Sequence, residues 1–157
     1  MTTTPYRTTF AHLHELQQAV GQELGLSQWV TVTQDDINTF ARLTGDEQWI
    51  HVDEEQSAKY SPYGTTVAHG FFVLSLASKF TYECLQVEDV KMGVNYGLNK
   101  VRFPSATPVN AKVRARISLL DYLAIPNGAR YTLQVVFELD GQEKPACVAE
   151  FVGQVYV

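Results

Sequence analysis

The chain has 157 residues and carries 12 lysines and arginines against 17 aspartates and glutamates, for a formal net charge of −5. Hydrophobic residues make up 45% of it and charged residues 18%, so the composition can fill the core of one ordinary domain and is unlike that of a disordered protein. Nucleic acids and anionic membranes select basic patches, and a mildly acidic chain with scattered bases is a poor candidate for either partner.

Signals for targeting and for thiol chemistry are missing from the sequence. No apolar run approaches the roughly 20 residues of a transmembrane helix, and the polar, threonine-rich residues 1–10 do not resemble a secretory signal. Cys84 and Cys147 lie far apart and outside any Cys-x-x-Cys spacing, so neither a disulfide scaffold nor a thiol metal site is indicated. We therefore expect one domain over residues 1–157, with reduced cysteines, in the cytoplasm.

Local patterns predict mainly helices in the first half of the chain. Residues 13–20 place apolar side chains at helical spacing, and residues 29–33 are typical of a short strand. Thr33 is a suitable N-cap for a helix over residues 34–44, since two acids follow it in the first turn, and Gly45 can end that helix in the left-handed conformation.

The most hydrophobic segment of the chain follows a short helix predicted over residues 54–59. Residues 68–85 read AHGFFVLSLASKFTYECL, with apolar side chains on nearly every side. A helix that is apolar all round is typical of the interior of a protein. We therefore predict one long, buried helix here.

The second half of the chain is mainly β-structure. Alternating apolar and polar residues are clearest at residues 112–117, and Pro, Asn and Gly mark the turns. The predicted strands cover residues 92–103, 109–121, 130–139 and 146–157. Four consecutive strands joined by turns favour an antiparallel meander, and the buried helix needs a cover. The expected fold class is α+β, with an antiparallel sheet wrapped around one central helix.

Asp46 and His51 are the first candidates for chemistry. Asp46 begins the loop after the helix that ends at Gly45, and His51 follows five residues later. A carboxylate and an imidazole that share a water suit general acid–base work near neutral pH. The same residues could instead cap a turn and fill space. A third metal ligand at the usual spacing is lacking, although Asp53 or His69 could be recruited by folding, and we predict no metal site.

His69 and Gly70 open the predicted central helix. The first amides of a helix lack partners within it, and a glycine there lets another group approach the backbone closely. Such a helix start can stabilise a developing negative charge. The alternative is that Gly70 only permits close packing and that His69 is a satisfied interior histidine.

Several polar residues further along could contact a ligand. Ser78 lies on the central helix, where it either faces a site or bonds back to its own backbone. Lys100 and Arg102 could meet a phosphate-bearing ligand or line a solvated strand face. Asn95 and Asn99 could bond an amide-containing ligand.

Two motifs that occur in order resemble a known family. FARLTGDEQWIHVD, followed 19 residues after His51 by Gly70 in TTVAHGFFVLSL, resembles the MaoC-like dehydratases, which include the (R)-specific enoyl-CoA hydratases and have the hotdog fold. The stretch NYGLNKVRFPSATPV is similar to the NodN-like branch of that family. The resemblance extends from about Val20 to the C-terminus. It implies a long helix wrapped by an antiparallel sheet, in agreement with the expectation from the pattern.

The resemblance also implies roles for individual residues. Asp46 and His51 match the family's acid–base pair, and Gly70 matches the glycine whose N–H stabilises an oxyanion. Ser78 matches a serine that supports the site. Gln48 stands where the family usually has Asn, and we count it among the residues that contact substrate.

The activity that the resemblance implies is the reversible addition of water to a trans-2-enoyl-CoA, giving an (R)-3-hydroxyacyl-CoA. The CoA thioester is then the substrate, and neither a metal nor a redox cofactor is needed. Lys100 and Arg102 would meet the CoA phosphates, with Asn95 and Asn99 near the pantetheine. The resemblance also implies that the protein is a homodimer.

Three other interpretations compete with the hydratase. A hotdog acyl-CoA thioesterase would use a carboxylate and a helix-start oxyanion site, with the water aimed at the thioester carbonyl. A non-catalytic acyl-binding or partner subunit would bind ligand without turnover. A small α+β domain with purely structural polar loops would leave the joint occurrence of the two motifs unexplained.

Overall fold

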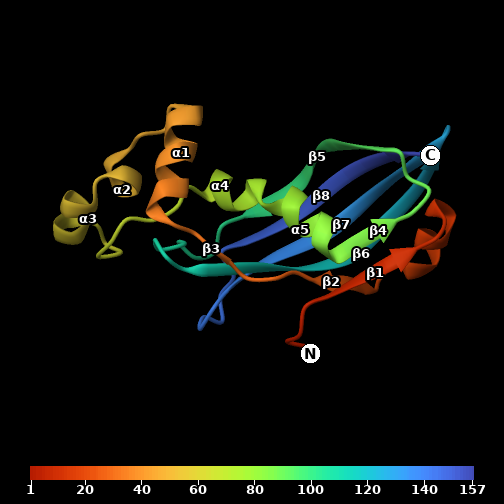
Figure 1. The fold of residues 1–157 in the computed structure, drawn as a ribbon, viewed down its shortest axis with the longest axis horizontal. Coiled ribbons are helices and arrows are strands. Elements are labelled where there is room, and N and C mark those ends of the chain that lie inside the picture. The colour runs from red at the N-terminus through yellow and green to blue at the C-terminus, as the bar shows by residue number, and fades with distance from the viewer.

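Eight strands form one sheet in the computed structural model, which describes residues 1–157, and two consecutive helices lie along one face of that sheet (Figure 1). The order across the sheet is β4-β1-β2-β6-β7-β8-β5, and the short β3 pairs with β6. The strands are β1 Tyr6–Phe10, β2 Glu23–Leu26, β3 Val30–Thr31, β4 Leu85–Val87, β5 Met92–Arg102, β6 Lys112–Ile125, β7 Gly128–Leu139 and β8 Cys147–Tyr156.

The helices fall into two groups. The α4 and α5 helices cross the face of the sheet, whereas α1, α2 and α3 form a cluster beyond its end (Figure 1). A 3-10 helix, η1, follows β1. Their bounds are η1 Leu13–Ala19, α1 Gln34–Thr44, α2 Trp49–Val52, α3 Glu54–Tyr60, α4 Gly70–Ser75 and α5 Ala77–Cys84. No helix has the length and apolarity needed to cross a membrane.

The α+β class is confirmed, but the first half of the chain holds more β-structure than its pattern predicts. The strands β1, β2 and β4 were not predicted. Their pairing is long-range, since β1 runs antiparallel to β2 and parallel to β4. Short strands of this kind depend on distant partners more than on local propensity.

The single buried helix predicted over residues 68–85 is wrong in two respects. The helical part begins at Gly70 and is broken at Leu76, whose N–H bonds the Val73 carbonyl in a tighter turn. Only one stripe is buried, and it consists of Val73, Ala77, Phe80 and Cys84. Phe71 and Tyr82 face outward, 72% and 76% exposed. The apolar side chains of this segment are therefore divided between a face buried in the core and a face exposed to solvent.

The predicted antiparallel meander holds for three of its four strands. β6, β7 and β8 pair in sequence order, but β5 pairs with β8 and forms the far edge of the sheet. The sequence pattern marks the strands without fixing their order, because pairing partners are chosen by non-local contacts. β5 consequently shows a free edge, and almost all of its residues are exposed.

The core lies between α4–α5 and the inner face of β6, β7 and β8, and every second residue of β7 is buried in it. On the outer face, Arg114 and Arg116 are also buried, at 8% and 9% exposed. Both guanidinium groups bond Glu138, and they also bond the carbonyl oxygens of Thr3 and Thr2. This ion-pair network holds the N-terminal residues against the sheet.

Candidate active site

The end of α1 delivers Asp46 to the site. As predicted, Thr33 caps the start of α1, with its hydroxyl accepting the Asp36 N–H at 3.2 Å. Gly45 ends the helix at φ 78°, a conformation that costs glycine little. The chain then leaves the helix axis, and Asp46 follows with a side chain that is 54% exposed.

His51 is carried by α2, directly beside the chain segment that leads into α4. Gln34 at the start of α1 donates to the His51 carbonyl at 2.7 Å. The Val67 N–H bonds the Ile50 carbonyl at 3.0 Å, so α2 and the segment before Gly70 are joined. His51 is 7% exposed. These contacts fix a buried imidazole next to an open carboxylate.

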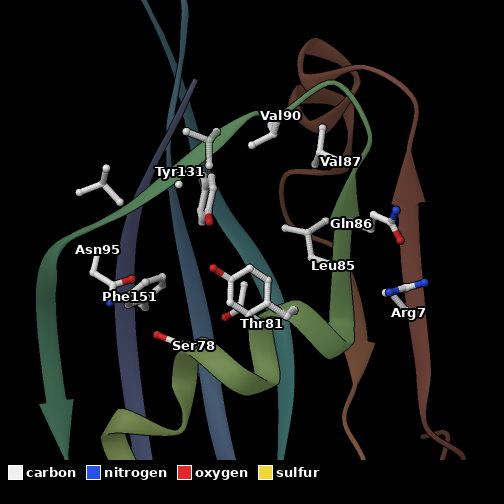
Figure 2. A pocket seen from close by; sticks show the side chains of 14 residues that line it. Arg7, Ser78, Thr81, Leu85, Gln86, Val87, Val90, Asn95, Tyr131 and Phe151 are labelled. Atoms are coloured by element: carbon white, nitrogen blue, oxygen red, sulfur yellow. The ribbon is translucent and has the colours of Figure 1, made fainter. Parts of the chain in front are cut away.

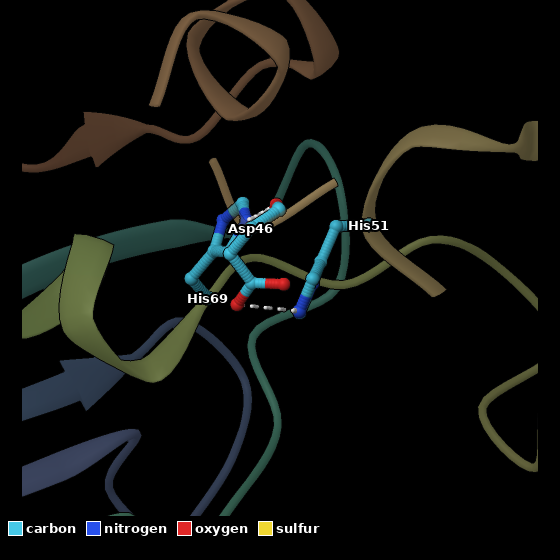
Figure 3. Close-up of side chains that lie close together, drawn as sticks. All are labelled: Asp46, His51 and His69. Atoms are coloured by element: carbon cyan, nitrogen blue, oxygen red, sulfur yellow. Dashed lines mark hydrogen bonds and ion pairs between the residues drawn. The ribbon is translucent and has the colours of Figure 1, made fainter. Parts of the chain in front are cut away.

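The two side chains face one another (Figure 3). His51 Nε2 lies 4.0 Å from Asp46 Oδ2. His51 Nδ1 lies 2.6 Å from the Val67 carbonyl oxygen, and because a carbonyl only accepts, Nδ1 carries the proton. The Nε2 lone pair of the neutral ring is therefore free toward Asp46. A water at ordinary hydrogen-bond distance, about 2.8 Å, reaches both atoms.

The surroundings keep His51 neutral. Burial lowers the pKa of His51 below its ordinary value, and the neighbouring His69 acts in the same direction. The hydrogen bond to the Val67 carbonyl and the Asp46 charge oppose this without reversing it. A neutral imidazole at neutral pH is the form that can accept a proton from water.

His69 packs directly against this pair. Its ring stacks on His51, with the centroids 3.9 Å apart and the planes 25° from parallel. His69 Nε2 lies 2.8 Å from the main-chain oxygen of Asp46. The sequence allows two roles for the His69 side chain, as a satisfied interior residue or as part of the site, and its position immediately before Gly70 is the one signal for the second role.

Asp46, His51 and His69 bring potential metal-ligand atoms within 4.8 Å of one another. A metal ion binds near the plane of an imidazole ring, whereas the rings of His51 and His69 are stacked face to face, 25° from parallel. The arrangement therefore suits proton transfer better than chelation, and the absence of a metal stays a prediction.

Gly70 is the first residue of α4, and its N–H is among the amides that have no partner within the helix. A Cβ at Gly70 would lie 3.1 Å from the Phe103 ring. The ring of Phe103 thus covers the glycine closely. The Phe103 ring also meets Phe71 edge-on, with the ring centroids 6.3 Å apart, so the surroundings of Gly70 are aromatic.

Ser78 and Asn95 meet at a cavity of about 460 Å³ (Figure 2). Ser78 reaches it from α5 and Asn95 from β5, with β4 on the opposite side and the sheet behind. Much of its wall is apolar, including Leu85, Val87, Val90, Val94, Tyr131, Phe151 and Val155. Ser78 lies about two helical turns beyond Gly70. α4 begins at Gly70, next to the His69 that stacks on His51, and α5 carries Ser78 to the cavity. The cavity therefore lies further along these two helices than the Asp46–His51 pair does.

The remaining predicted contacts are exposed and have no hydrogen bond or ion pair to Asp46 or His51 through their side chains. Gln48 caps the start of α2. Asn99, Lys100 and Arg102 lie on the free-edge strand β5, and the Arg102 guanidinium bonds only the neighbouring Val101 carbonyl. The structure brings Asp46, His51 and His69 together and leaves these four at the rim or on β5.

Comparisons with known proteins identify the family of the chain. Residues 15–135 match the family model described as the MaoC like domain. The chain is 47% identical over 145 residues to 3-hydroxyacyl-thioester dehydratase Z of Mycobacterium tuberculosis, which covers 92% of this chain and 95% of that protein. It is 40% identical over 149 residues to nodulation protein N of Rhizobium leguminosarum bv. viciae, which covers 89% and 91%.

The fold is likewise that of solved structures. An R-hydratase from Pseudomonas aeruginosa, in its unliganded form, is similar with a TM-score of 0.67 at 19% identity, over 87% of this chain and 81% of that one. This likeness concerns the fold, and it confirms the hotdog architecture that the sequence motifs implied. Because the family model spans most of the chain and both relatives match nearly end to end, the chain belongs to the MaoC-like family, and its similarity to nodulation protein N places it with the NodN-like members.

Proposed function

We propose that the protein catalyses the reversible addition of water to a trans-2-enoyl-CoA, giving an (R)-3-hydroxyacyl-CoA. The observation that carries the proposal is the Asp46–His51 pair, whose reactive atoms lie 4.0 Å apart with the imidazole nitrogen unprotonated. The name of the mycobacterial relative, a 3-hydroxyacyl-thioester dehydratase, supports the same chemistry.

The coarse class of the activity follows from family membership. Relatives that match this chain nearly end to end are named dehydratases, and both acid–base residues are present and face one another. The protein is a hydro-lyase. The acyl-CoA substrate, the R stereochemistry and the hydration direction are the proposal's own additions.

In the hydration direction, a water lies between Asp46 and His51. The pair removes one proton as the water oxygen forms a bond to the β-carbon of the enoyl group. The electron pair of the α,β double bond moves toward the thioester, whose oxygen gains enolate charge. The α-carbon then takes a proton back from the same pair, so one water is added and no electron is lost.

The developing charge on the thioester oxygen needs a donor. The Gly70 N–H is unpaired within α4 and opens the helix that follows His69. A preorganised amide of this kind is worth roughly 10²–10³ in rate in other enzymes. The Phe103 ring packs against Gly70, where a Cβ would lie 3.1 Å from it, so the absence of a side chain at this position lets the ring lie close to the helix start.

The rest of the substrate needs an apolar space and a charged rim. We propose that the acyl chain extends into the cavity lined by Ser78 and Asn95. Lys100 and Arg102 are then the residues for the CoA phosphates, with Asn99 and Gln48 nearer the pantetheine. The exposure of all four at the surface suits contacts with a large, charged nucleotide.

The free edge of β5 supports the proposal of a homodimer. An 11-residue strand with an unpaired edge is open to pairing with another chain. Apolar side chains at 44–55% exposure lie along it, namely Met92, Val94, Tyr96 and Leu98. A second copy that pairs through the same edge would cover them by two-fold symmetry.

We further propose that residues 1–157 act as a single domain in the cytoplasm, without a metal or redox cofactor. Water addition transfers no electrons to an acceptor, so the reaction as written requires none. The net charge of −5 favours a small-molecule substrate over a nucleic acid or membrane partner.

The test is to incubate the purified protein with crotonyl-CoA and with longer trans-2-enoyl-CoA thioesters. The expected result is loss of the conjugated enoyl absorbance, formation of the (R)-3-hydroxy product and no free thiol. Release of thiol would instead establish a thioesterase. Binding of these thioesters with no product of either kind would establish a non-catalytic partner subunit.

A further inference from the structure

We propose that His69 is a positioning residue, which holds Asp46 and His51 in register by bonding the Asp46 main chain and stacking on the His51 ring. The inference deepens the proposed function and rests on it. His69 is not placed in contact with the reacting atoms, and its effect passes through the two residues that are.

The hydrogen bond from His69 is the strongest anchor that Asp46 has. His69 Nε2 donates to the Asp46 carbonyl oxygen at 2.8 Å. The other bonds at Asp46 are long: its N–H reaches the Thr44 hydroxyl at 3.4 Å, and its Oδ1 accepts the Gln48 N–H at 3.5 Å. Asp46 lies on an exposed connection just beyond the end of α1. Without His69, little would fix where its carboxylate points.

The ring itself is rigidly held. His69 is 3% exposed and lies between His51, at 3.9 Å, and Phe40, at 5.0 Å between ring centroids. The segment before His69 is held as well, because the Val67 carbonyl oxygen accepts the hydrogen bond from His51 Nδ1. The same short segment thus orients the His51 ring from its edge, through Val67, and from its face, through His69.

One nitrogen of His69 argues against a role in packing alone. Nδ1 is buried and has no hydrogen-bond partner. A buried polar atom without a partner destabilises the fold, and Leu or Phe would fill the same space without that cost. A histidine at this position is explained by what its other nitrogen does, which is to donate to Asp46.

The contacts also define the protonation of the ring. Because the Asp46 carbonyl only accepts, His69 carries its proton on Nε2. The other ring nitrogen, Nδ1, has no partner, so nothing in the site competes for this tautomer. The charged and titratable groups that face His69 are Asp46 and His51.

Two substitutions separate the hydrogen bond from the stack. In His69→Gln, the amide NH₂ can occupy the position of Nε2 and keep the bond to Asp46, while the stacked ring is lost. In His69→Phe, the ring stays between His51 and Phe40, while the donor is lost. We expect His69→Phe to lower kcat on the order of 100-fold, as misplacement by about 1 Å does, with KM changed less than about threefold. His69→Gln should recover most of that loss.

A packing role predicts the opposite order, with His69→Phe near wild type and His69→Gln impaired, and that result would overturn the proposal. Phe40→Leu is the control, because it loosens the same packing and should lower the melting temperature without the selective loss of kcat.

Long-range proton–nitrogen NMR of the wild-type protein gives a readout that needs neither activity nor a variant. It should find His69 protonated at Nε2 and His51 at Nδ1 near neutral pH. The other tautomer at His69 would refute the positioning bond even if hydration is observed, whereas an inactive protein with these tautomers would count against the proposed function alone.

Discussion

The tautomers of two histidines are set by main-chain carbonyl oxygens, one from Val67 and one from Asp46. This matters at the residue scale because an imidazole can act as a base only through the nitrogen that lacks a proton. In His51 that nitrogen faces the carboxylate of Asp46. The geometry therefore supplies the base without any rearrangement.

The pH dependence of the reaction follows from the burial of His51. Desolvation lowers its pKa below the ordinary value of about 6.5, so the neutral form persists into mildly acidic solution. We expect kcat/KM to fall only as the pH drops through this lowered pKa. A pH profile on crotonyl-CoA checks this, and an acidic midpoint at or above about 6.5 would contradict it. The lowered pKa of His51 also affects folding stability. Between the lowered pKa and about pH 6.5, the unfolded chain binds more protons at His51 than the folded chain does. The contribution of His51 to folding stability is therefore present above about pH 6.5 and is lost as the pH falls toward the lowered pKa.

Lys100 and Arg102 allow a test of the CoA contact. Neither guanidinium nor ammonium group is paired with an acid, so each is free to bond a phosphate. Removing one such charge, in Lys100→Gln or Arg102→Gln, should raise KM by up to about tenfold while kcat changes less. Lys112→Gln, an exposed lysine on β6, is the matched control. A loss in kcat alone would show that these residues do not bind the nucleotide.

Sequence reasoning reached part of this site. Asp46 and His51 are five residues apart, and the helix end at Gly45 that precedes them is a local feature, so the pair could be predicted. The role of His69 could not, because its contacts cross 23 residues to Asp46 and 18 to His51 and depend on how the segment before α4 folds back. Patterns along the chain do not reveal such a stack.

At the element scale, the break between α4 and α5 separates two functions of one apolar stretch. Ser75 Oγ donates to the Phe72 carbonyl at 2.6 Å, and this local bond competes with the regular helical pattern just before Leu76. α4 begins at Gly70, directly after His69, which stacks on His51. α5 presents Ser78 to the cavity beside β5.

The cavity should determine which acyl chains are accepted. Ser78→Ile adds apolar volume inside it, since Ser78 is part of the cavity wall. We expect kcat/KM for an eight-carbon enoyl-CoA to fall tenfold or more, in line with the 10–200-fold that a methylene-sized misfit costs in other enzymes. Turnover of crotonyl-CoA in the same variant is the internal control and should change less than about threefold. An equal loss for both chains would place the acyl group elsewhere.

Elements with local signals were the ones the sequence could predict. α1 has its cap and its terminating glycine within its own residues, and both were found where the pattern placed them. β1 and β4 lack such signals. Each is short, and their parallel pairing joins residues about 77 positions apart, as between Thr8 and Leu85. Partners at that distance are chosen by the folded chain as a whole.

On the scale of the whole molecule, the order of the strands leaves β5 at an edge with apolar side chains exposed along it. Phe71 on α4 and Tyr82 on α5 are further exposed aromatic side chains. Monomeric proteins usually protect such edges with charges or cover. A second copy supplies that cover in the proposed dimer.

The dimer can be tested with one charge on the edge strand. Leu98→Lys places a cation at a β5 position that is 44% exposed, and it should shift the protein from dimer to monomer. Light scattering at micromolar concentration should give twice the chain mass for the wild type and the single-chain mass for the variant. Leu123→Lys, at a β6 position that is 53% exposed, is the matched control and should stay dimeric. A monomeric wild type would contradict the dimer.

The central claim is that Asp46 and His51 together add water to an enoyl thioester. The most direct test of this claim compares the wild type with Asp46→Asn. The initial rate of enoyl absorbance loss is measured for both proteins with crotonyl-CoA, or with whichever longer enoyl-CoA the wild type converts fastest. General acid–base groups contribute about 10²–10⁴-fold, so Asp46→Asn should lose that much kcat while its melting temperature stays near that of the wild type. A folded Asp46→Asn protein that still turns over at a near-normal rate would contradict the claim.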